Sequence, residues 1–336
     1  MLKCEKNLIR KDLIVKRHTR ILLFEFLLVL ILLTAFPVIS NAASKVPRNK
    51  LVTEQGASYY YNHKGKIVRD RMITWKKNTY YFDKNGQMYR NRTFSYQGHV
   101  YHARNSGALA RNTWIDGYYY NSYGQRTGKP FNSSSSGTAS SVLNKKPQKK
   151  IISMKNIRQN PQLPTGCESV ALTIVLKHMG FPLSKTTIAS RYLSRSSSNF
   201  VTKFWGNPFS GSGGGIYAPG LTITANKYLK AKKSAKRAYD LTGIRFSDLY
   251  TYLDNNIPVI VWNSMYMRNP VAVHSYRYAG KTWHFYRSEH CVVLCGYDKK
   301  NKKVLINDPL SGLVWRKASS FERIYNKLGK MAVVIQ

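Results

Sequence analysis

The stretch that decides the fold of the C-terminal half is Gln159-Asn-Pro-Gln-Leu-Pro-Thr-Gly-Cys167-Glu-Ser-Val-Ala-Leu-Thr-Ile-Val-Leu-Lys-His-Met-Gly180. The Pro and Gly before Cys167 mark a loop, and the apolar residues after it recur with helical spacing until Gly180 provides a stop signal. Thr165 and Glu168, three residues apart, fit a capping box at a helix start. The pattern therefore predicts a helix of about 13 residues with Cys167 in its first turn.

A cysteine in the first turn of a helix is a candidate nucleophile. Unpaired backbone N–H groups and the helix dipole favour the thiolate there and lower the pKa of the thiol. Position alone leaves a buried structural cysteine open as the alternative. Cys291 and Cys295 lie four residues apart on an expected strand, which separates them by about 13 Å, too far for a disulfide. We therefore take Cys167 as the free thiol with a functional setting.

A base for this nucleophile is offered by Ser288-Glu-His290-Cys-Val-Val-Leu-Cys-Gly-Tyr-Asp298. This run predicts a strand that begins near His290, and a second strand at 304–307 ends at Asp308. With a three-residue turn at 299–301, Asp308 lies on the same face of the sheet as His290. A turn of another length would place Asp308 on the opposite face.

Three further histidines and a glycine-rich segment offer no second site. His178 lies late on the expected helix, and His274 and His284 lie in Tyr/Arg-rich segments without an acidic partner, so we expect surface or packing roles for them. Residues 211–220 lack the strand and the Lys-Ser/Thr of a phosphate loop, and we expect a mobile loop at the mouth of a cleft. No metal-ligand spacing is present, so no metal or other cofactor is expected.

The N-terminal half contains four similar segments. In each, a Tyr-rich run is followed by a polar turn closed by glycine, and the glycines are Gly65, Gly86, Gly107 and Gly124. An aromatic strand, the turn and a second short strand predict one β-hairpin per repeat. A lone hairpin is marginal in water, so the repeats are expected to stack and bury aromatic side chains between neighbours.

The termini and the linker complete the expected organisation. A basic N-terminus, an apolar run at 21–39 and small residues before Ala43 have the anatomy of a secretory signal peptide, which would remove Cys4. An uncleaved membrane anchor is the alternative, since the apolar run is just long enough to span a bilayer. The expected segments are a signal peptide (1–42), hairpin repeats (43–129), a Ser/Lys-rich linker (130–150) and a globular domain (151–336).

The net charge of the chain limits the kinds of partner that we expect it to bind. The formal net charge is +39, from 54 Lys and Arg against 15 Asp and Glu. Such a charge favours a polyanionic environment and opposes self-association, so we expect a monomer. The basic residues are spread along the chain without a nucleic-acid-binding motif, and the export signal makes anionic cell-wall polymers better partners than nucleic acid.

The repeats resemble the cell-wall-binding repeats of choline-binding and glucan-binding proteins, most closely at 75–88. That resemblance implies grooves between hairpins that bind choline or sugar on aromatic faces, although the same side chains can serve only to hold the stack together. The third repeat departs from the pattern, with His102 and Ala103 where aromatic residues are usual. The candidate ligand-binding residues are Trp75, Tyr80, Tyr81, Trp114, Tyr118 and Tyr119.

The C-terminal half resembles family 39 of the cysteine peptidases, the bacteriocin-leader (double-glycine) processing family, in its secreted branch without a transporter. The resemblance rests on Gly-Cys-Glu on a helix and on the motifs around His290 and Asp308. It implies an α+β papain-like fold, in which a helical half that bears the cysteine faces an antiparallel sheet. It further implies Cys167 as nucleophile, His290 as general base and acid, Asp308 as orienting residue and Gln159 at the oxyanion hole, with Gln162 as the alternative glutamine.

The resulting hypothesis is a secreted, cell-wall-associated cysteine peptidase that acts on a peptide or protein. Two rivals stay open. One is an amidase or endopeptidase that cleaves peptidoglycan stem peptides, and the other is a wall-binding protein whose cysteine domain is catalytically inert.

Overall fold

The structure is a computed structural model that describes residues 46–128 and 147–336. The expected signal peptide and most of the expected linker lie outside the described residues. The chain divides into two compact units: one holds the described residues up to Val52 together with Tyr60–Ile67, and the other holds Thr53–Tyr59 and Val68–Gln336. Within the described ranges, no helix has the length and apolar character needed to cross a bilayer.

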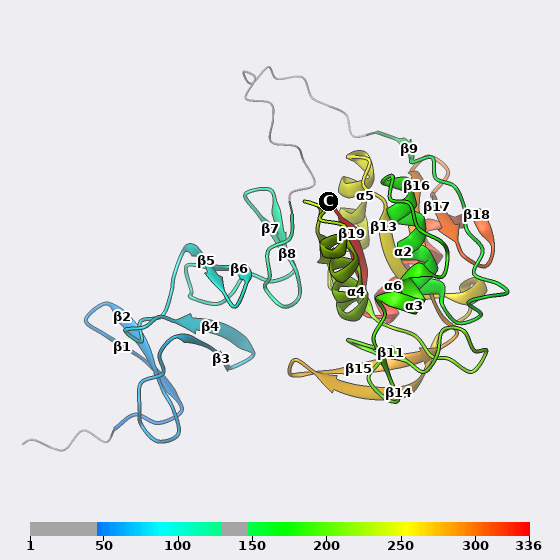
Figure 1. The fold of residues 1–336 in the computed structure, drawn as a ribbon. Coiled ribbons are helices and arrows are strands. Elements are labelled where there is room, and N and C mark those ends of the chain that lie inside the picture. The colour runs from blue at the N-terminus through cyan, green and yellow to red at the C-terminus, as the bar shows by residue number, and fades with distance from the viewer. Residues whose placement is uncertain (1–45, 129–146) are drawn as a thin grey trace, which may run out of the picture. The chain divides into compact units, whose positions relative to one another are not determined.

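Residues 50–120 form four two-stranded hairpins (Figure 1). The two residues that join the strands of each hairpin have positive φ, as at Asp116 (50°) and Gly117 (75°), which is the geometry of a type I′ turn. The strand pairs are β1 (Lys50–Glu54) with β2 (Ala57–Tyr61), β3 (Arg71–Trp75) with β4 (Asn78–Phe82), β5 (Arg92–Tyr96) with β6 (His99–Ala103), and β7 (Thr113–Ile115) with β8 (Tyr118–Tyr120).

The glycine-closed turns are not the hairpin turns, which corrects the expected order of elements. The Tyr-rich strand is the second strand of each hairpin, and beyond the glycine turn only an isolated bridge forms, as between Phe82 and Met88. The reason is that the segment after the turn bonds to the preceding repeat: Met88 N–H donates to Ser58 O at 2.8 Å, and Leu109 N–H donates to Thr79 O at 2.8 Å. These bonds stack one repeat on the next.

The C-terminal domain is built on a seven-stranded sheet whose pairings are antiparallel. The expected antiparallel sheet is confirmed, and its first strand takes Lys149 and Lys150 from the end of the expected linker. The order of strands is β12 (Ala238–Asp240), β19 (Ala332–Ile335), β13 (Val259–Ser264), β16 (Glu289–Asp298), β17 (Lys303–Asp308) and β18 (Gly312–Lys317), and β9 (Lys149–Ile151) also pairs with β16.

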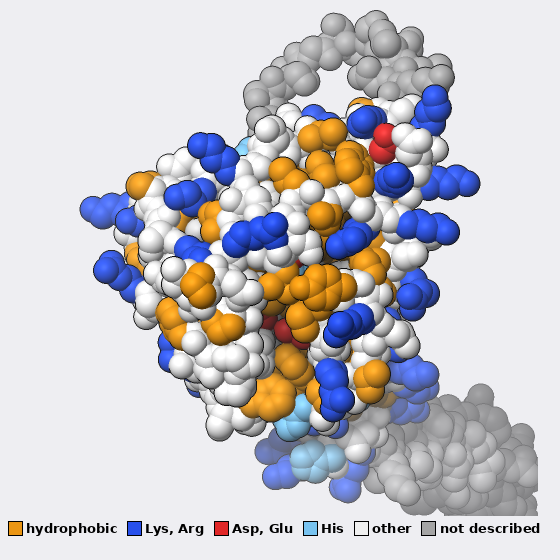
Figure 2. Space-filling model, turned by 90° about the vertical axis from the view of Figure 1, so that its right-hand side faces the viewer, with side chains coloured by type: hydrophobic (Ala, Val, Ile, Leu, Met, Phe, Trp, Pro, Cys, Tyr) orange, Lys and Arg blue, Asp and Glu red, His pale blue; other side chains and the backbone are white. Residues whose placement is uncertain are grey.

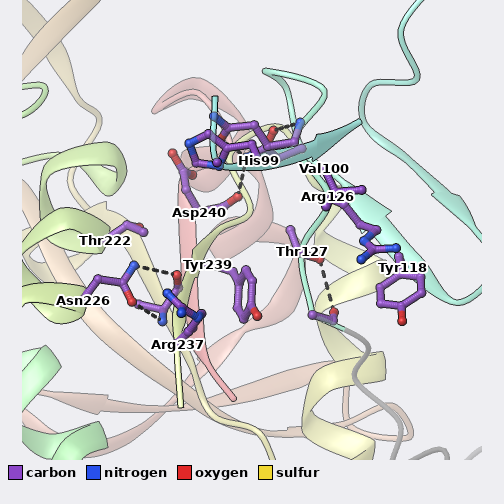
Figure 3. Close-up of a pocket in the computed structure, with 15 residues that line it drawn as sticks. His99, Val100, Tyr118, Arg126, Thr127, Thr222, Asn226, Arg237, Tyr239 and Asp240 are labelled. Carbon is purple, nitrogen blue, oxygen red and sulfur yellow. Dashed lines mark hydrogen bonds between the residues drawn. The ribbon is translucent and has the colours of Figure 1, made fainter. Parts of the chain in front are cut away.

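Helices and two smaller sheets surround this sheet. Helix α2 packs on β16, α4 on β12 and α6 on β13. Asn226 of α4 also fixes the start of β12, because its side chain exchanges two hydrogen bonds with the backbone of Ala238, both drawn in the pocket view of Figure 3. The remaining elements are α2 (Cys167–His178), α3 (Thr187–Arg191), β10 (Arg195–Ser196), β11 (Phe204–Trp205), α4 (Ala218–Ala231), α5 (Phe246–Asp254), the 3₁₀ helix η1 (Met265–Met267), β14 (Val271–Tyr278), β15 (Lys281–Arg287) and α6 (Ala318–Lys327).

A β-bulge sets the register between β16 and β17. The turn that joins them spans four residues, 299–302, one more than expected. Gly296 pairs with Leu305 but Leu294 pairs with Ile306, so Cys295 is an extra residue in β16. The bulge moves the register back by one position, and the end of β17 therefore returns to the face on which the expected three-residue turn would have placed it.

Basic side chains cover much of the surface. Figure 2 shows Lys and Arg spread over one face of the molecule, with hydrophobic side chains gathered between them near the centre.

Candidate active site

Cys167 is the first residue of α2, as predicted, and the helix spans 12 residues. The predicted capping box is wrong, because Gly166 precedes the helix and no side chain caps it. The Thr165 hydroxyl instead donates to Ser210 O at 2.9 Å, and Glu168 Oε1 accepts the backbone N–H of Ile216 at 2.7 Å. Both side chains therefore hold the neighbouring loop against the helix start instead of satisfying the helix's own N–H groups.

His290 and Asp308 form a buried pair on adjacent strands. His290 Nε2 and Asp308 Oδ1 are 2.7 Å apart, and the two residues are 2% and 3% exposed. The same Oδ1 accepts the backbone N–H of Leu310 at 2.7 Å. Burial raises the pKa of Asp308, but hydrogen bonds from His290 and the backbone outweigh burial, so the net pKa lies below the ordinary value.

Cys167 lies beside this pair. The backbone N–H of Cys291, the residue after His290, donates to Cys167 Sγ at 3.4 Å, although 124 residues separate them. Cys167, Gln159 and His290 line one cavity of about 140 Å³. The four residues expected to act together are thus brought together around this cavity, three of them in its lining and Asp308 behind His290.

Gln159 is the glutamine that reaches the cavity. It is 2% exposed, and its Nε2 donates to Pro164 O at 2.7 Å. An amide nitrogen carries two N–H donors, so one remains besides the bond to Pro164, while Gln159 Oε1 is buried without a hydrogen-bond partner among the described residues. Gln162 is exposed and is not among the cavity residues.

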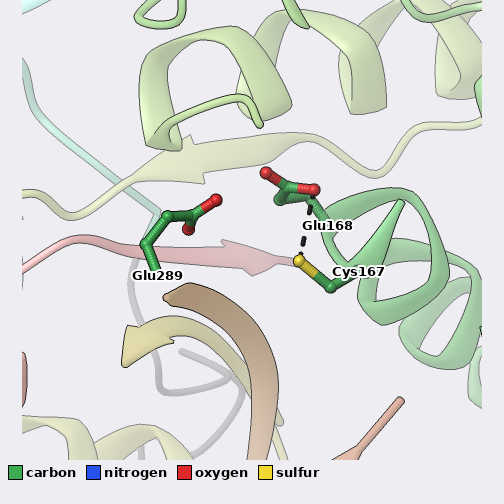
Figure 4. A group of neighbouring side chains, drawn as sticks. All are labelled: Cys167, Glu168 and Glu289. Carbon is green, nitrogen blue, oxygen red and sulfur yellow. Dashed lines mark hydrogen bonds between the residues drawn. The ribbon is translucent and has the colours of Figure 1, made fainter. Parts of the chain in front are cut away.

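Two glutamates that were not predicted as site residues lie beside Cys167. The Cys167 thiol donates to Glu168 Oε2 at 3.4 Å, and the thiol and carboxyl oxygens of Cys167, Glu168 and Glu289 lie within 4.8 Å of one another (Figure 4). Glu168 is 0% and Glu289 8% exposed. The available signal was position in the sequence, since Glu168 directly follows Cys167 and Glu289 directly precedes His290. Nothing in the local sequence indicates that the two glutamates meet.

The expected low pKa of the Cys167 thiol is corrected. Burial, followed by the nearby charges of Glu168 and Glu289, raises this pKa well above its ordinary value. A helix N-terminus cannot outweigh removal from water in the presence of two carboxyls.

The glycine-rich segment lines the cavity and is tied to β11. Gly213 and Gly214 are cavity residues, while Gly214 N–H donates to Trp205 O and Trp205 N–H donates to Gly215 O, at 2.8 and 2.9 Å. A Cβ at Gly215 would clash with carboxyl oxygens of Glu168 and Glu289, so a larger residue there would displace these two side chains.

The three histidines for which a surface or packing role was predicted, His178, His274 and His284, have such environments. His178 is exposed, and the ring of His274 stacks on Trp205 with centroids 4.9 Å apart. The backbone carbonyl of His284 accepts the hydroxyl of Tyr217 at 2.8 Å. Cys291 and Cys295 are free thiols, both buried.

The aromatic candidates of the repeats differ in exposure. Tyr80 and Tyr81 are each 8% exposed and Tyr119 is 1% exposed, so these three rings mainly hold the stack. Tyr81 packs parallel to Phe94 of the next hairpin, with centroids 4.7 Å apart. Trp75 keeps more of its surface, and the Lys76 ammonium lies 4.7 Å above its ring.

The last hairpin uses its candidates differently. Trp114 packs against Tyr119 and against Tyr252 of α5, with centroid distances of 5.4 and 5.9 Å. The Arg126 guanidinium lies 4.2 Å above the ring of Tyr118. Trp75 and Tyr118 thus already bind a cation on an aromatic face, the contact by which such rings recognise quaternary ammonium groups.

The fold and this constellation define the class. A helix that bears a cysteine, packed on an antiparallel sheet that bears a His–Asp pair, forms an α+β domain of the papain-like cysteine peptidase class. The chain belongs to the Peptidase_C39 like family, whose model matches residues 151–333. Family and fold together support a peptidase.

Three similar proteins illustrate the two halves. The YvpB protein of Bacillus subtilis is 32% identical over 185 residues, 52% of this chain and 71% of that protein. A crystal structure described as a C39-like peptidase from Bacillus anthracis is 27% identical, covers 56% of this chain and 97% of its own, and has a TM-score of 0.50. The choline-binding domain of Spr1274 from Streptococcus pneumoniae is 33% identical, covers 25% of this chain and 100% of its own, and has a TM-score of 0.24.

Proposed function

We propose that the chain is a secreted, cell-wall-associated cysteine peptidase that hydrolyses peptide bonds with Cys167, His290 and Asp308. The observation that supports this most is the buried 2.7 Å contact between His290 and Asp308 at a cavity that Cys167 and Gln159 also line. Nothing in this proposal requires a cofactor.

The hydrogen bonds support a role for each group in this proposal. Asp308 engages Nε2 of His290, which leaves Nδ1 as the nitrogen that takes the thiol proton. The sulfur then attacks the substrate carbonyl carbon, and the oxyanion receives the second N–H of the Gln159 amide. His290 returns its proton to the leaving amine, and water hydrolyses the resulting thioester with His290 again as base.

The repeats would hold this activity at the wall. Their aromatic faces at Trp75 and Tyr118 already carry Lys76 and Arg126, which suits an exchange for choline, and stacked aromatic rings suit sugars equally. The net charge of +39 adds attraction to anionic wall polymers. The domain boundaries at residues 42, 129 and 150 remain part of this proposal.

One experiment tests the proposal. The purified chain, Cys167→Ala, His290→Ala and the double variant are incubated with a peptide library and with isolated cell walls. Each single variant should lose nearly all hydrolysis, and the double variant should be little worse, because residues that act as a unit are not additive. Substantial hydrolysis by Cys167→Ala contradicts the proposal, and release of wall stem peptides without library cleavage favours the amidase or endopeptidase alternative.

Secretion has its own measurement. Cleavage after Ala42 predicts Ala43 as the N-terminus of protein recovered from culture supernatant, and recovery of only the membrane-bound full-length chain contradicts it.

A further inference from the structure

The starting point is a pair of buried acids beside the nucleophile without a cation. In the part of the chain that the structure describes, no Lys or Arg forms an ion pair with Glu168 or Glu289. Glu289 Oε2 is buried without a hydrogen-bond partner. Two carboxylates in a dry site cannot both hold a negative charge beside a third anion, the Cys167 thiolate, so the group must retain protons.

The neighbours of the pair offer no other compensation. The ionisable groups that face it are Cys167 on α2, His290 and Cys291 on β16, and Tyr217 at the start of α4. His290 is the one group among them that can become positively charged, and its Nε2 is already hydrogen-bonded to Asp308. Gly215 lies close to both carboxyls, since a Cβ there would clash with Glu168 Oε1 and Glu289 Oε1.

Glu168 is the member that touches the reacting sulfur. Its Oε1 is fixed by the Ile216 N–H, which leaves Oε2 directed at Cys167 Sγ at 3.4 Å. Oε2 can share a proton with the sulfur in two ways. A protonated Glu168 donates to the thiolate, whereas an ionised Glu168 accepts from the thiol.

We propose that Glu168 is a catalytic residue whose protonated carboxyl donates a hydrogen bond to the Cys167 thiolate, and whose ionisation returns the sulfur to the unreactive thiol. The proposal rests on the proposed function of Cys167 as nucleophile. Because burial raises the pKa of the Cys167 thiol, the reactive form is a minor one, in which the thiol proton has moved to His290 while Glu168 keeps its own proton and donates to the anionic sulfur. When the pH rises, Glu168 loses its proton to solvent, and the sulfur takes back the proton of the His290 imidazolium. Glu168 is then a carboxylate that accepts a hydrogen bond from the Cys167 thiol.

The pH range follows from the burial of Glu168. Burial raises the pKa of this carboxyl to about 7, despite hydrogen bonds that lower it. Burial, followed by the neighbouring Glu168, raises the pKa of Glu289 well above its usual range, so Glu168 is the member of the pair that ionises first. The reactivity of Cys167 is therefore expected to fall above about pH 7, whereas an ordinary thiol becomes more reactive up to its pKa of about 8.5.

The test is the rate at which iodoacetamide alkylates Cys167, followed by mass spectrometry of its peptide from about pH 5 to about pH 9. At one pH unit above a pKa of about 7, about one tenth of Glu168 stays protonated. The wild-type rate at about pH 8 should thus be about tenfold below its plateau. A wild-type rate that rises steadily through this range overturns the proposal.

Three variants assign the effect to one residue. In Glu168→Gln the amide oxygen can accept the Ile216 N–H while the amide N–H donates to the sulfur at every pH, so the fall above about pH 7 should disappear. Glu289→Gln should keep the fall, and so should the matched control Glu322→Gln on α6. Loss of the fall in Glu289→Gln and its retention in Glu168→Gln overturn the assignment.

Two further measurements keep the result interpretable. Infrared spectra of the wild type should show the C=O stretch of a protonated carboxyl that decreases in one step near pH 7, which requires no variant to fold; absence of that step overturns the proposal. Alkylation needs no substrate, so the expected profile without any peptide hydrolysis refutes the proposed function while the role of Glu168 at the sulfur stands.

Discussion

Replacing Asp308 by asparagine is the sharpest test of how the triad is held. The His290 Nε2 and the Leu310 N–H are both hydrogen-bonded to the same oxygen, Asp308 Oδ1, each at 2.7 Å. The amide oxygen of Asp308→Asn can accept both bonds, and the Leu310 N–H selects that rotamer. The imidazole should therefore keep its orientation and lose only the negative charge that stabilises its protonated form.

The magnitude follows from the change in hydrogen-bond type. A bond to a charged acceptor contributes about 1.5–3 kcal/mol and a neutral one about 0.5–1.5 kcal/mol, so the loss is about 1–2 kcal/mol. That difference corresponds to a fall in kcat of about 5- to 30-fold. A rotated amide would select the wrong histidine tautomer instead, and an effect of about 10⁴-fold is then expected.

Asp308→Ala provides the contrast, because it removes the acceptor of the buried His290 Nε2 and of the part-buried Leu310 N–H. Each such group costs about 1–3 kcal/mol, so kcat should fall at least about tenfold further than in Asp308→Asn. The assay is peptide hydrolysis under saturating substrate, with thermal unfolding to verify folding. Asp298→Asn is the matched control, since the side chain of this acid at the far end of β16 bonds to Asn301 and Lys149 and lies away from the cavity residues. Equal impairment of Asp308→Asn and Asp308→Ala refutes the reasoning.

The other predictions concern the oxyanion, the buried acid and the repeats. Gln159→Ala should lower kcat by about two to three orders of magnitude with little change in KM if the amide serves the oxyanion; a change in KM alone, measured by steady-state kinetics, contradicts this. The folded-state pKa of Glu168, about 7, lies above its ordinary value of 4.5, so its contribution to stability is full below about pH 4.5 and is lost as the pH rises to about 7. Chemical unfolding should then show Glu168→Gln gaining stability relative to wild type across that window, and a constant difference counts against the assigned pKa. Binding of the chain to isolated Gram-positive walls should weaken with salt in its electrostatic part, while the aromatic part persists and is competed by choline or glycan; Trp75→Ala should remove the competed part, and binding that high salt abolishes entirely leaves only a charged surface.

Much of the organisation could be predicted because its signals are local. The presence and position of helix α2 follow from apolar residues that recur with helical spacing between a Pro/Gly loop and Gly180. The structure places the start of this helix at Cys167, as expected. The repeats follow from recurrent aromatic runs and glycines. The order of strands within a repeat could not be obtained in the same way, since each segment after a glycine turn bonds to the previous repeat and not to its own strand.

The meeting of His290 and Asp308 shows how a correct result can depend on an unseen feature. The prediction used a three-residue turn, whereas the turn has four residues and the bulge at Cys295 compensates for the extra one. The carbonyl of Cys295 accepts the Ile152 N–H at 2.8 Å, so contact with the chain just after β9 accompanies the bulge. The contact joins residues that lie far apart in the sequence, so the residues of β16 alone show no pattern that would predict the bulge.

The sequence by itself determined which residues are candidates for the chemistry of a cysteine peptidase, where the helix that bears Cys167 begins, and that aromatic repeats precede that domain. Those properties depend on residue type and short-range spacing. Only the tertiary structure decided that Cys291 reaches Cys167 across 124 residues, that Gly215 lies against two carboxyl groups, and that Glu168 and Glu289 lie beside the thiol. The thiol's pKa depends on how much water and how many charges surround it, and these are set by the packing of α2, β16 and the glycine-rich loop.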